Sequence, residues 1–224
     1  MRKSVEIIPA ILPKDFAELT DKVGLIKGFA KTVQIDICDG QFVPNATWPY
    51  KKRDDSFEKI IHEDEGMPEW KDLNYEFDLM VNRPEEVVTD WVSAGAMRVI
   101  VHAEARGNVS EAIALLRDRA EIGIALNIET PISIIEPYAD QIQFVQCMGI
   151  DNIGFQHQQF DEKVIAKVRE VKAKFPHLPV SVDGGVSLES APKLIAAGAN
   201  RLVVGSAIFN DENPIDAIQR FKRL

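Results

Sequence analysis

The sequence is poor in the features that mark secreted and membrane proteins. It has two cysteines in 224 residues, Cys38 and Cys147, too few for a disulfide framework. No window approaches the roughly 20 apolar residues that a membrane span requires. The N-terminus also has no complete apolar signal segment followed by a small-residue cleavage site. We therefore expect a soluble, unanchored protein in a reducing cytoplasm.

Blocks of basic residues are missing as well. The 26 Lys and Arg residues face 35 Asp and Glu residues, which gives a formal net charge of -9. Because no long Lys/Arg run offsets this deficit, the composition argues against nonspecific nucleic-acid binding. An anionic substrate would need local cationic groups or backbone donors.

Short apolar or β-branched runs alternate with helical patterns along the whole chain. The expected strands cover residues 5–12, 32–37, 75–80, 98–102, 123–127, 143–148, 180–183 and 202–205. The expected helices lie near 14–28, 56–64, 84–93, 108–121, 131–139, 160–175, 187–197 and 214–222. Eight β-then-α units predict a single α/β domain over 1–224, a (β/α)8 TIM barrel. A doubly wound open sheet is the alternative, because periodicity does not show whether the last strand pairs with the first.

Local signals refine this pattern at helix ends and in one long connection. Asn108 and Ser187 are expected N-caps, and Gly198 is expected to end a helix. Residues 38–55 form an unusually long connection, which is typical of lids or disordered segments. A polar stretch at 62–72 predicts a surface insertion near 50–74.

Two aspartates end short apolar runs: Asp36 and Asp183. In a barrel, the strand C-termini form the working face, so both would lie at one pocket. An opposed carboxylate pair can remove a proton from one face of a carbon and return one to the other, the chemistry of an epimerase or isomerase. Alternation along the strand places Gln34 and Cys38 on the same face as Asp36.

Several motifs in order along the chain carry a family resemblance. They are IIPAIL with KDF (7–16), DICDGQFVPN (36–45), DLMV (78–81), HAEA (102–105), VDGGV (182–186) and VGSAIF (204–209). Together they resemble the ribulose-phosphate 3-epimerase family over nearly the whole length. The resemblance implies an isomerase that interconverts D-ribulose 5-phosphate and D-xylulose 5-phosphate, with Asp36 and Asp183 as the acid/base pair at C3.

The resemblance also implies how a small phosphorylated sugar is bound. The matching positions are Met80 and Met148 over the sugar, and the backbone N–H groups of Gly154, Gly184, Gly185, Gly205 and Ser206 around the phosphate. Such amide donors can bind an anion without a cationic side chain. Because the family forms dimers and larger assemblies, a homo-oligomer is a further expectation.

Two substitutions change the family's metal site. The family holds a divalent metal with two Asp and two His, but Gln34 and Asp78 stand at the His positions here. The four positions become Gln34, Asp36, Asp78 and Asp183, an all-oxygen set. One interpretation is a site retuned from Zn or Fe to a harder cation such as Mg or Mn. The other is a site without a metal, in which clustered carboxylates repel and at least one pKa rises.

Further departures leave the function open. In the phosphate loop DNIGFQHQQF (151–160), Gln156 and His157 replace two glycines, and their side chains would crowd the backbone approach to a phosphate. His102 is interpreted as a hydrogen-bonded barrel residue, with a metal ligand as the alternative. Glu104 is interpreted as a residue that caps or orients a neighbour, with proton transfer as the alternative. The alternatives to epimerisation are a related barrel with another sugar-phosphate substrate or reaction, and a non-catalytic homologue.

The long connection contains two residues whose roles are also open. Asp39, directly before Gly40, fits ordinary turn chemistry, although a role as a third acid is an alternative. Trp48 is followed by a short basic run at 51–53, and this part of the connection is either a lid that faces the substrate or a solvated surface segment.

Overall fold

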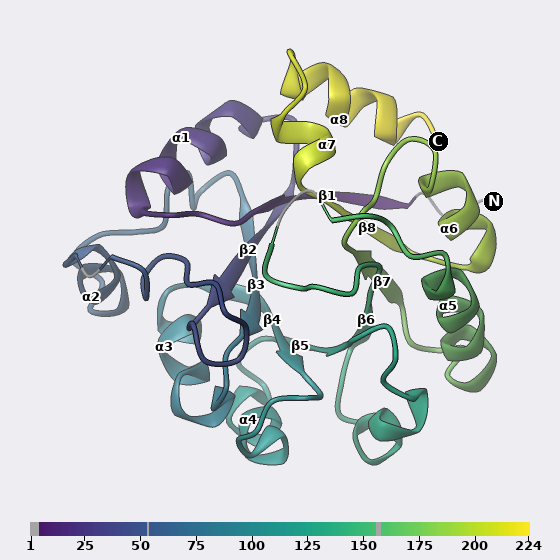
Figure 1. Cartoon of the computed structure of the whole chain (residues 1–224). Coiled ribbons are helices and arrows are strands. Elements are labelled where there is room, and N and C mark those ends of the chain that lie inside the picture. Colours follow the sequence, from purple (N-terminus) through teal and green to yellow (C-terminus); the bar gives the residue numbers. More distant parts are fainter. Residues whose placement is uncertain (1–4, 53, 156–157) are drawn as a thin grey trace.

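A computed structural model describes residues 5–52, 54–155 and 158–224. Within these residues, eight parallel strands close into one barrel (Figure 1). The strands are β1 (Glu6–Ile11), β2 (Thr32–Cys38), β3 (Asn74–Met80), β4 (Ala96–His102), β5 (Glu121–Leu126), β6 (Phe144–Met148), β7 (Val180–Asp183) and β8 (Arg201–Val204). Because β1 pairs with β8, the barrel prediction is confirmed and the open sheet is excluded.

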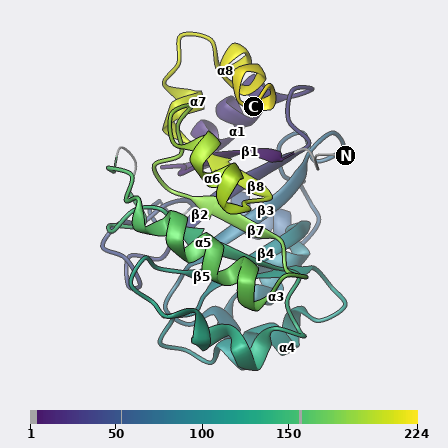
Figure 2. The ribbon, with the colours of Figure 1, turned by 90° about the vertical axis from the view of Figure 1, so that its right-hand side faces the viewer.

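Helices surround the barrel, and the side view in Figure 2 places α5 and α6 outside β7 and β8. They are α1 (Phe16–Ile26), α2 (Ser56–Ile61), the 3₁₀ helix η1 (Pro84–Glu86), α3 (Val88–Ser93), α4 (Val109–Leu116), the 3₁₀ helix η2 (Ile132–Tyr138), α5 (Lys163–Lys174), α6 (Ala191–Ala197), α7 (Ser206–Phe209) and α8 (Pro214–Lys222). None of the helices in these described stretches is long and apolar enough to cross a membrane.

The helix-end predictions have mixed outcomes. The Asn108 side chain caps α4 by accepting a hydrogen bond from the Glu111 N–H at 3.1 Å. Gly198 follows α6 with φ 112°, a conformation that glycine adopts readily. Ser187 lies four residues before the first residue of α6, but its hydroxyl accepts from the Ser190 N–H at 3.2 Å and its carbonyl from the Ala191 N–H at 2.9 Å, so it caps the turn that leads into the helix.

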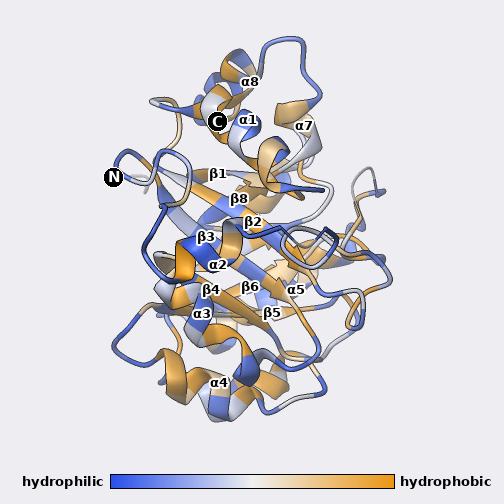
Figure 3. Cartoon of the chain, turned by 90° about the vertical axis from the view of Figure 1, so that its left-hand side faces the viewer, coloured by the Kyte–Doolittle hydropathy of each residue, from blue (hydrophilic) through white to orange (hydrophobic). Residues whose placement is uncertain are grey.

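Alternation along the strands separates two cores. On β2, Val33, Ile35 and Ile37 pack in the large apolar cluster between strands and helices. Cys38 belongs to a smaller cluster with Met80 and other residues inside the barrel. Apolar and polar residues also alternate along the surrounding helices (Figure 3). The predicted common face for Gln34, Asp36 and Cys38 is therefore the barrel interior.

The long connection after β2 packs against the barrel. Trp48 is fully buried, and its indole N–H donates to the Ser56 hydroxyl at 2.8 Å. Its ring lies 5.3 Å from Phe16 and 5.5 Å from Phe57, measured between ring centroids. At Trp48 both interpretations of this part of the connection, a substrate-facing lid and a solvated surface segment, were wrong, because this indole is a core side chain.

The polar stretch at 62–72 joins α2 to β3 at the end of the barrel opposite the strand C-termini. It consists of turns, with Met67 buried and Trp70 exposed. It lies away from the residues expected to do chemistry.

Candidate active site

An open pocket lies at the carboxyl ends of the strands. Asp36 and Asp183 line it together with all the residues expected to bind substrate: Met80, Met148, Gly154, Gly184, Gly185, Gly205 and Ser206. Gln34 and Asp78 are fully buried next to this pocket. The structure thus brings the predicted residues together, while their roles stay predictions.

Three carboxylates meet inside the barrel. Asp36 comes from β2, Asp78 is its register partner on β3, and Asp183 ends β7. One oxygen of each lies within 4.8 Å of the others, close enough to hold a metal ion. Strand alternation explains the meeting, because all three side chains point inward from neighbouring levels of the barrel.

The Gln34 amide joins the two predicted acid/base residues. Its Nε2 donates to Asp36 Oδ1 at 2.8 Å and to Asp183 Oδ2 at 2.7 Å. The opposite orientation would point the amide oxygen at two acidic groups, so electrostatics favours the nitrogen in this place. A side chain expected to offer an oxygen to a cation here offers hydrogens to the carboxylates.

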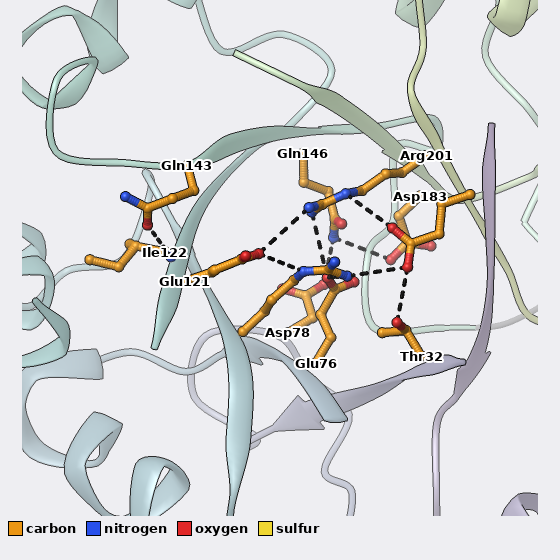
Figure 4. A network of polar contacts seen from close by, with 11 residues as sticks. Thr32, Glu76, Asp78, Glu121, Ile122, Gln143, Gln146, Asp183 and Arg201 are labelled. Carbon is orange, nitrogen blue, oxygen red and sulfur yellow. Dashed lines mark hydrogen bonds and ion pairs between the residues drawn. The ribbon is translucent and has the colours of Figure 1, made fainter. Parts of the chain in front are cut away.

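Gln146 on β6 is a site residue that sequence reasoning missed. It is fully buried, and its Nε2 lies 3.2 Å from Asp78 Oδ2 and 3.4 Å from Asp183 Oδ2 (Figure 4). One signal was present, since Gln146 is a polar residue within the apolar run FVQCM. A buried amide needs hydrogen-bond partners, so its position predicted a polar neighbour.

His102, at the end of β4, lies between two carboxylates. Its Nε2 is 3.2 Å from Asp78 Oδ1, and its Nδ1 is 3.7 Å from Glu104 Oε2. Burial alone would lower the pKa of His102, but the two carboxylates outweigh burial and raise the pKa to about 10. Glu104 in turn accepts the Asn127 N–H at 2.8 Å, so it orients its neighbours as expected.

Burial and mutual repulsion govern the protonation of the acid/base pair. Burial, followed by the charges of Asp183 and Asp78, raises the pKa of Asp36 well above its usual value. Burial, followed by the charge of Asp78, raises the pKa of Asp183 to about 7. Two carboxyl groups that resist ionising together favour a state with one proton between them.

The phosphate end of the pocket is shaped by backbone. Gly184 and Gly185 have φ of 100° and 67°, and a Cβ on Gly185 would lie 2.7 Å from the Phe160 Cα. Only glycine satisfies both constraints. The Asn45 amide donates to the Gly154 carbonyl at 2.8 Å, which ties the connection after β2 to the loop after β6. Gln156 and His157 lie outside the described residues.

Asp39 is a structural turn residue. Its Oδ1 accepts the N–H groups of Gln41 at 2.7 Å and Phe42 at 2.8 Å, and its Oδ2 accepts the Asn82 N–H at 2.8 Å. With both oxygens engaged by backbone donors, Asp39 holds the start of the long connection against the end of β3.

Comparison with known proteins places the chain in a family. The model of the ribulose-phosphate 3 epimerase family matches residues 6–209. The chain belongs to this family. The ribulose-phosphate 3-epimerase of Bacillus subtilis is 34% identical over 97% of this chain and 98% of its own length. The Schizosaccharomyces pombe enzyme is 31% identical over 95% of this chain and 90% of its own length. The chain is accordingly an epimerase-type isomerase.

Solved structures support the fold. KGPDC from Streptococcus mutans has a TM-score of 0.72 and covers 98% of this chain and 96% of its own, at 14% identity. A 3-hexulose-6-phosphate synthase has a TM-score of 0.70 and covers 97% of this chain and 98% of its own, at 17% identity. At such low identity the likeness concerns the barrel alone.

The family implies a divalent cation, and the residues present fit it only in part. Asp36, Asp78 and Asp183 could hold a metal by their spacing, and their oxygens suit Mg or Mn better than Zn. However, Asp36 Oδ1 and Asp183 Oδ2 already accept hydrogens from the Gln34 amide. A cation shared by these two oxygens does not fit while the amide keeps this orientation.

Proposed function

We propose that the protein interconverts D-ribulose 5-phosphate and D-xylulose 5-phosphate, with Asp36 and Asp183 as the acid/base pair at C3. The observation that carries the proposal is the pairing of these two carboxyl groups, which border one pocket and share one amide donor. They come from β2 and β7, so they approach the pocket from different sides of the barrel. Membership of the family and the names of its curated relatives support the substrate.

The chemistry needs one carboxylate and one carboxylic acid. The ionised Asp takes the C3 proton, and the C3–H electron pair forms the C2–C3 double bond of an enediolate as the carbonyl π pair moves to O2. The other Asp then gives its proton to C3 from the opposite face, and the C2 carbonyl re-forms. The raised pKa values of both groups support a resting state with a single proton. A positioned acid or base contributes about 10²- to 10⁴-fold to the rate.

The pocket suits the remaining parts of such a substrate. Met80 and Met148 present polarisable apolar surface to the sugar carbons. Among the described residues that line the pocket, none is cationic, so the phosphate would rest on backbone N–H groups near Gly184, Gly185 and Ser206. This arrangement meets the need for local donors in a chain of net negative charge.

The test follows hydrogen exchange at C3 by NMR. Ribulose 5-phosphate incubated with the protein in D₂O should gain deuterium at C3 and convert to xylulose 5-phosphate. Asp36→Asn and Asp183→Asn should each lower the exchange rate by about 10²- to 10⁴-fold, whereas Asp64→Asn, on the exposed stretch after α2, should leave it unchanged. Absence of exchange in the wild-type protein, with Mn²⁺, Mg²⁺, Zn²⁺ or no added metal, would contradict the proposal. Parallel assays with other ketose phosphates then separate a changed substrate from a silent homologue.

A further inference from the structure

Two glutamine amides connect the three carboxylates of Asp36, Asp78 and Asp183. Gln34 Nε2 lies between Asp36 and Asp183, at 2.8 Å and 2.7 Å from their oxygens. An amide nitrogen carries two hydrogens, so both are used by this pair. Within the part of the chain that the structure describes, the Gln34 Oε1 has no hydrogen-bond partner. The side chain therefore gives its two donors to the acid/base pair and leaves its acceptor unused.

Gln146 makes the second connection. Its Nε2 reaches Asp78 Oδ2 at 3.2 Å and Asp183 Oδ2 at 3.4 Å, so Asp183 Oδ2 accepts from both glutamines. Figure 4 shows Gln146 directed at Asp78 and Asp183. Each amide thus bridges two carboxylates, as a cation between two carboxylates would.

Burial makes the amides and the carboxylates depend on each other as hydrogen-bond partners. Gln34, Gln146 and Asp78 are fully buried. A buried carboxylate needs donors, and a buried amide without partners costs free energy, so each group requires the other. Gln34 stands two residues before Asp36 on one strand, and Gln146 stands two residues before Met148 on another. Both amides are therefore held by the rigid wall of the barrel.

We propose that the amides of Gln34 and Gln146 replace a bridging cation and act as positioning residues for Asp36 and Asp183. The positioning role of the two amides rests on the proposed function. Their replacement of a cation rests on hydrogen-bond geometry alone. A neutral donor holds the carboxylate oxygens in place without adding a fixed charge to the site. Proton transfer by the pair then requires no bound metal.

The first experiment measures metal binding, whether or not the protein turns over a substrate. Protein dialysed against EDTA is analysed by mass spectrometry for metals and melted with and without MnCl₂ or ZnCl₂. The wild-type protein should hold no stoichiometric metal and show no shift of its melting temperature. The double variant Gln34→His, Asp78→His should be stabilised by ZnCl₂, because it restores two imidazoles beside two carboxylates. Wild-type protein that carries about one tightly bound metal per chain would overturn the inference.

The second experiment tests the positioning role. Gln34→Met and Gln146→Met keep the length of the side chain and remove its donors. Gln34→Met should lower kcat about 10²-fold with little change in KM, because misplaced acid and base groups lose rate rather than binding. Gln219→Met, on the exposed face of α8, is the matched control and should be unchanged. Wild-type kcat in Gln34→Met, or loss of wild-type exchange after EDTA treatment with recovery on adding metal, would overturn the inference.

The two failures are distinguishable. If the wild-type protein exchanges no C3 proton under any condition, the proposed function fails. The metal content and the melting temperatures still decide whether the amides occupy the place of a cation. If exchange occurs only with added metal, the proposed function stands and the amide inference fails.

Discussion

The barrel holds two clusters of acidic residues, and they are neutralised in different ways. Towards the N-terminal ends of the strands, Glu76 and Glu121 meet Arg98, at 3.3 Å and 2.8 Å. Towards the C-terminal ends, Asp36 and Asp183 meet the neutral Gln34 amide. Figure 4 shows members of both clusters next to each other inside the barrel. Arginines face the carboxylates of the first cluster, whereas in the second a neutral amide contacts Asp36 and Asp183 and the cationic His102 lies beside Asp78.

The arginine cluster consists of Arg98 and Arg201 with the carboxylates of Glu6, Glu76 and Glu121. Arg201 lies 3.5 Å from Glu6 through its Nε and stacks over the Phe144 ring, 4.2 Å from the ring centroid. Guanidinium groups are always charged and offer several donors, which suits several carboxylates at once. In TIM barrels the N-terminal face serves stability, whereas the C-terminal face carries chemistry. The two clusters follow this division.

The largest expected effect is on catalysis, at the carboxyl end. Asp183→Asn should lower the rate of C3 exchange by about 10²- to 10⁴-fold. The variant should be no less stable than the wild type, because it removes a charge that burial and Asp78 already disfavour. NMR exchange and a thermal melt measure the two properties. A large drop in melting temperature would mean that the two clusters do not differ as described.

The next largest effect is on stability, in the arginine cluster near the N-terminal ends of the strands. Arg98→Met removes one of the two guanidinium groups that face Glu76 and Glu121, while Arg201 stays 3.8 Å from Glu76 and 3.7 Å from Glu121. The loss should therefore be smaller than the about 3–5 kcal/mol that follows when a buried ion pair loses its only partner. Urea unfolding measures the loss. Arg220→Met is the control, because Arg220 pairs with Asp211 on the surface, where such pairs contribute about 0–1 kcal/mol. Equal losses in both variants would contradict the comparison.

The pH dependence of stability tests the protonation of Glu76 in the arginine cluster. Burial raises the pKa of Glu76 from 4.5 to about 7, despite the opposing charges of Arg98 and Arg201. Because the folded state binds this proton more tightly, the contribution of Glu76 is fully present below about pH 4.5 and is lost as the pH rises through about 7. Urea midpoints at about pH 5 and pH 8 should therefore differ less in Glu76→Gln than in the wild type. If the urea midpoints at the two pH values differed more in Glu76→Gln than in the wild type, the predicted loss of stability with rising pH would be contradicted.

The smallest effect concerns the ring beneath Arg201. Phe144→Leu removes the aromatic face and should lower the unfolding free energy by about 1 kcal/mol from the lost cation–π contact, with a further loss from the smaller side chain. The melting temperature measures it. Leu115→Ala, on the exposed side of α4, is the control. It removes apolar atoms but no cation–π contact, so it should lower the unfolding free energy by less.

Much of the barrel was predictable because strands and helices leave periodic patterns. The eight strands were found from local runs, whereas closure depended on β1 pairing with β8 across nearly the whole chain. The helix expected near 131–139 forms as the 3₁₀ helix η2, with Pro137 inside it. Proline removes a backbone donor and clashes with the preceding turn, so an α-helix is disfavoured there.

The site was predictable where motifs carried it and not where partners came from distant strands. Asp36 and Asp183 stand in recognisable motifs, and the structure places both at one pocket. Gln146 and the arginine cluster were missed because their significance lies in pairings between strands far apart in sequence, such as Gln146 with Asp78 and Arg201 with Glu6. The orientation of the Gln34 amide was also beyond sequence, since it depends on the carboxylates that surround it.

The amide bridge of Gln34 has a consequence for the cell. If the amides replace a cation as proposed, the acid/base pair draws nothing from the supply of manganese, zinc or iron. Its turnover would then follow the concentrations of enzyme and sugar phosphate alone when these metals are scarce. Oxidants that attack protein-bound iron would likewise find no target in this pocket.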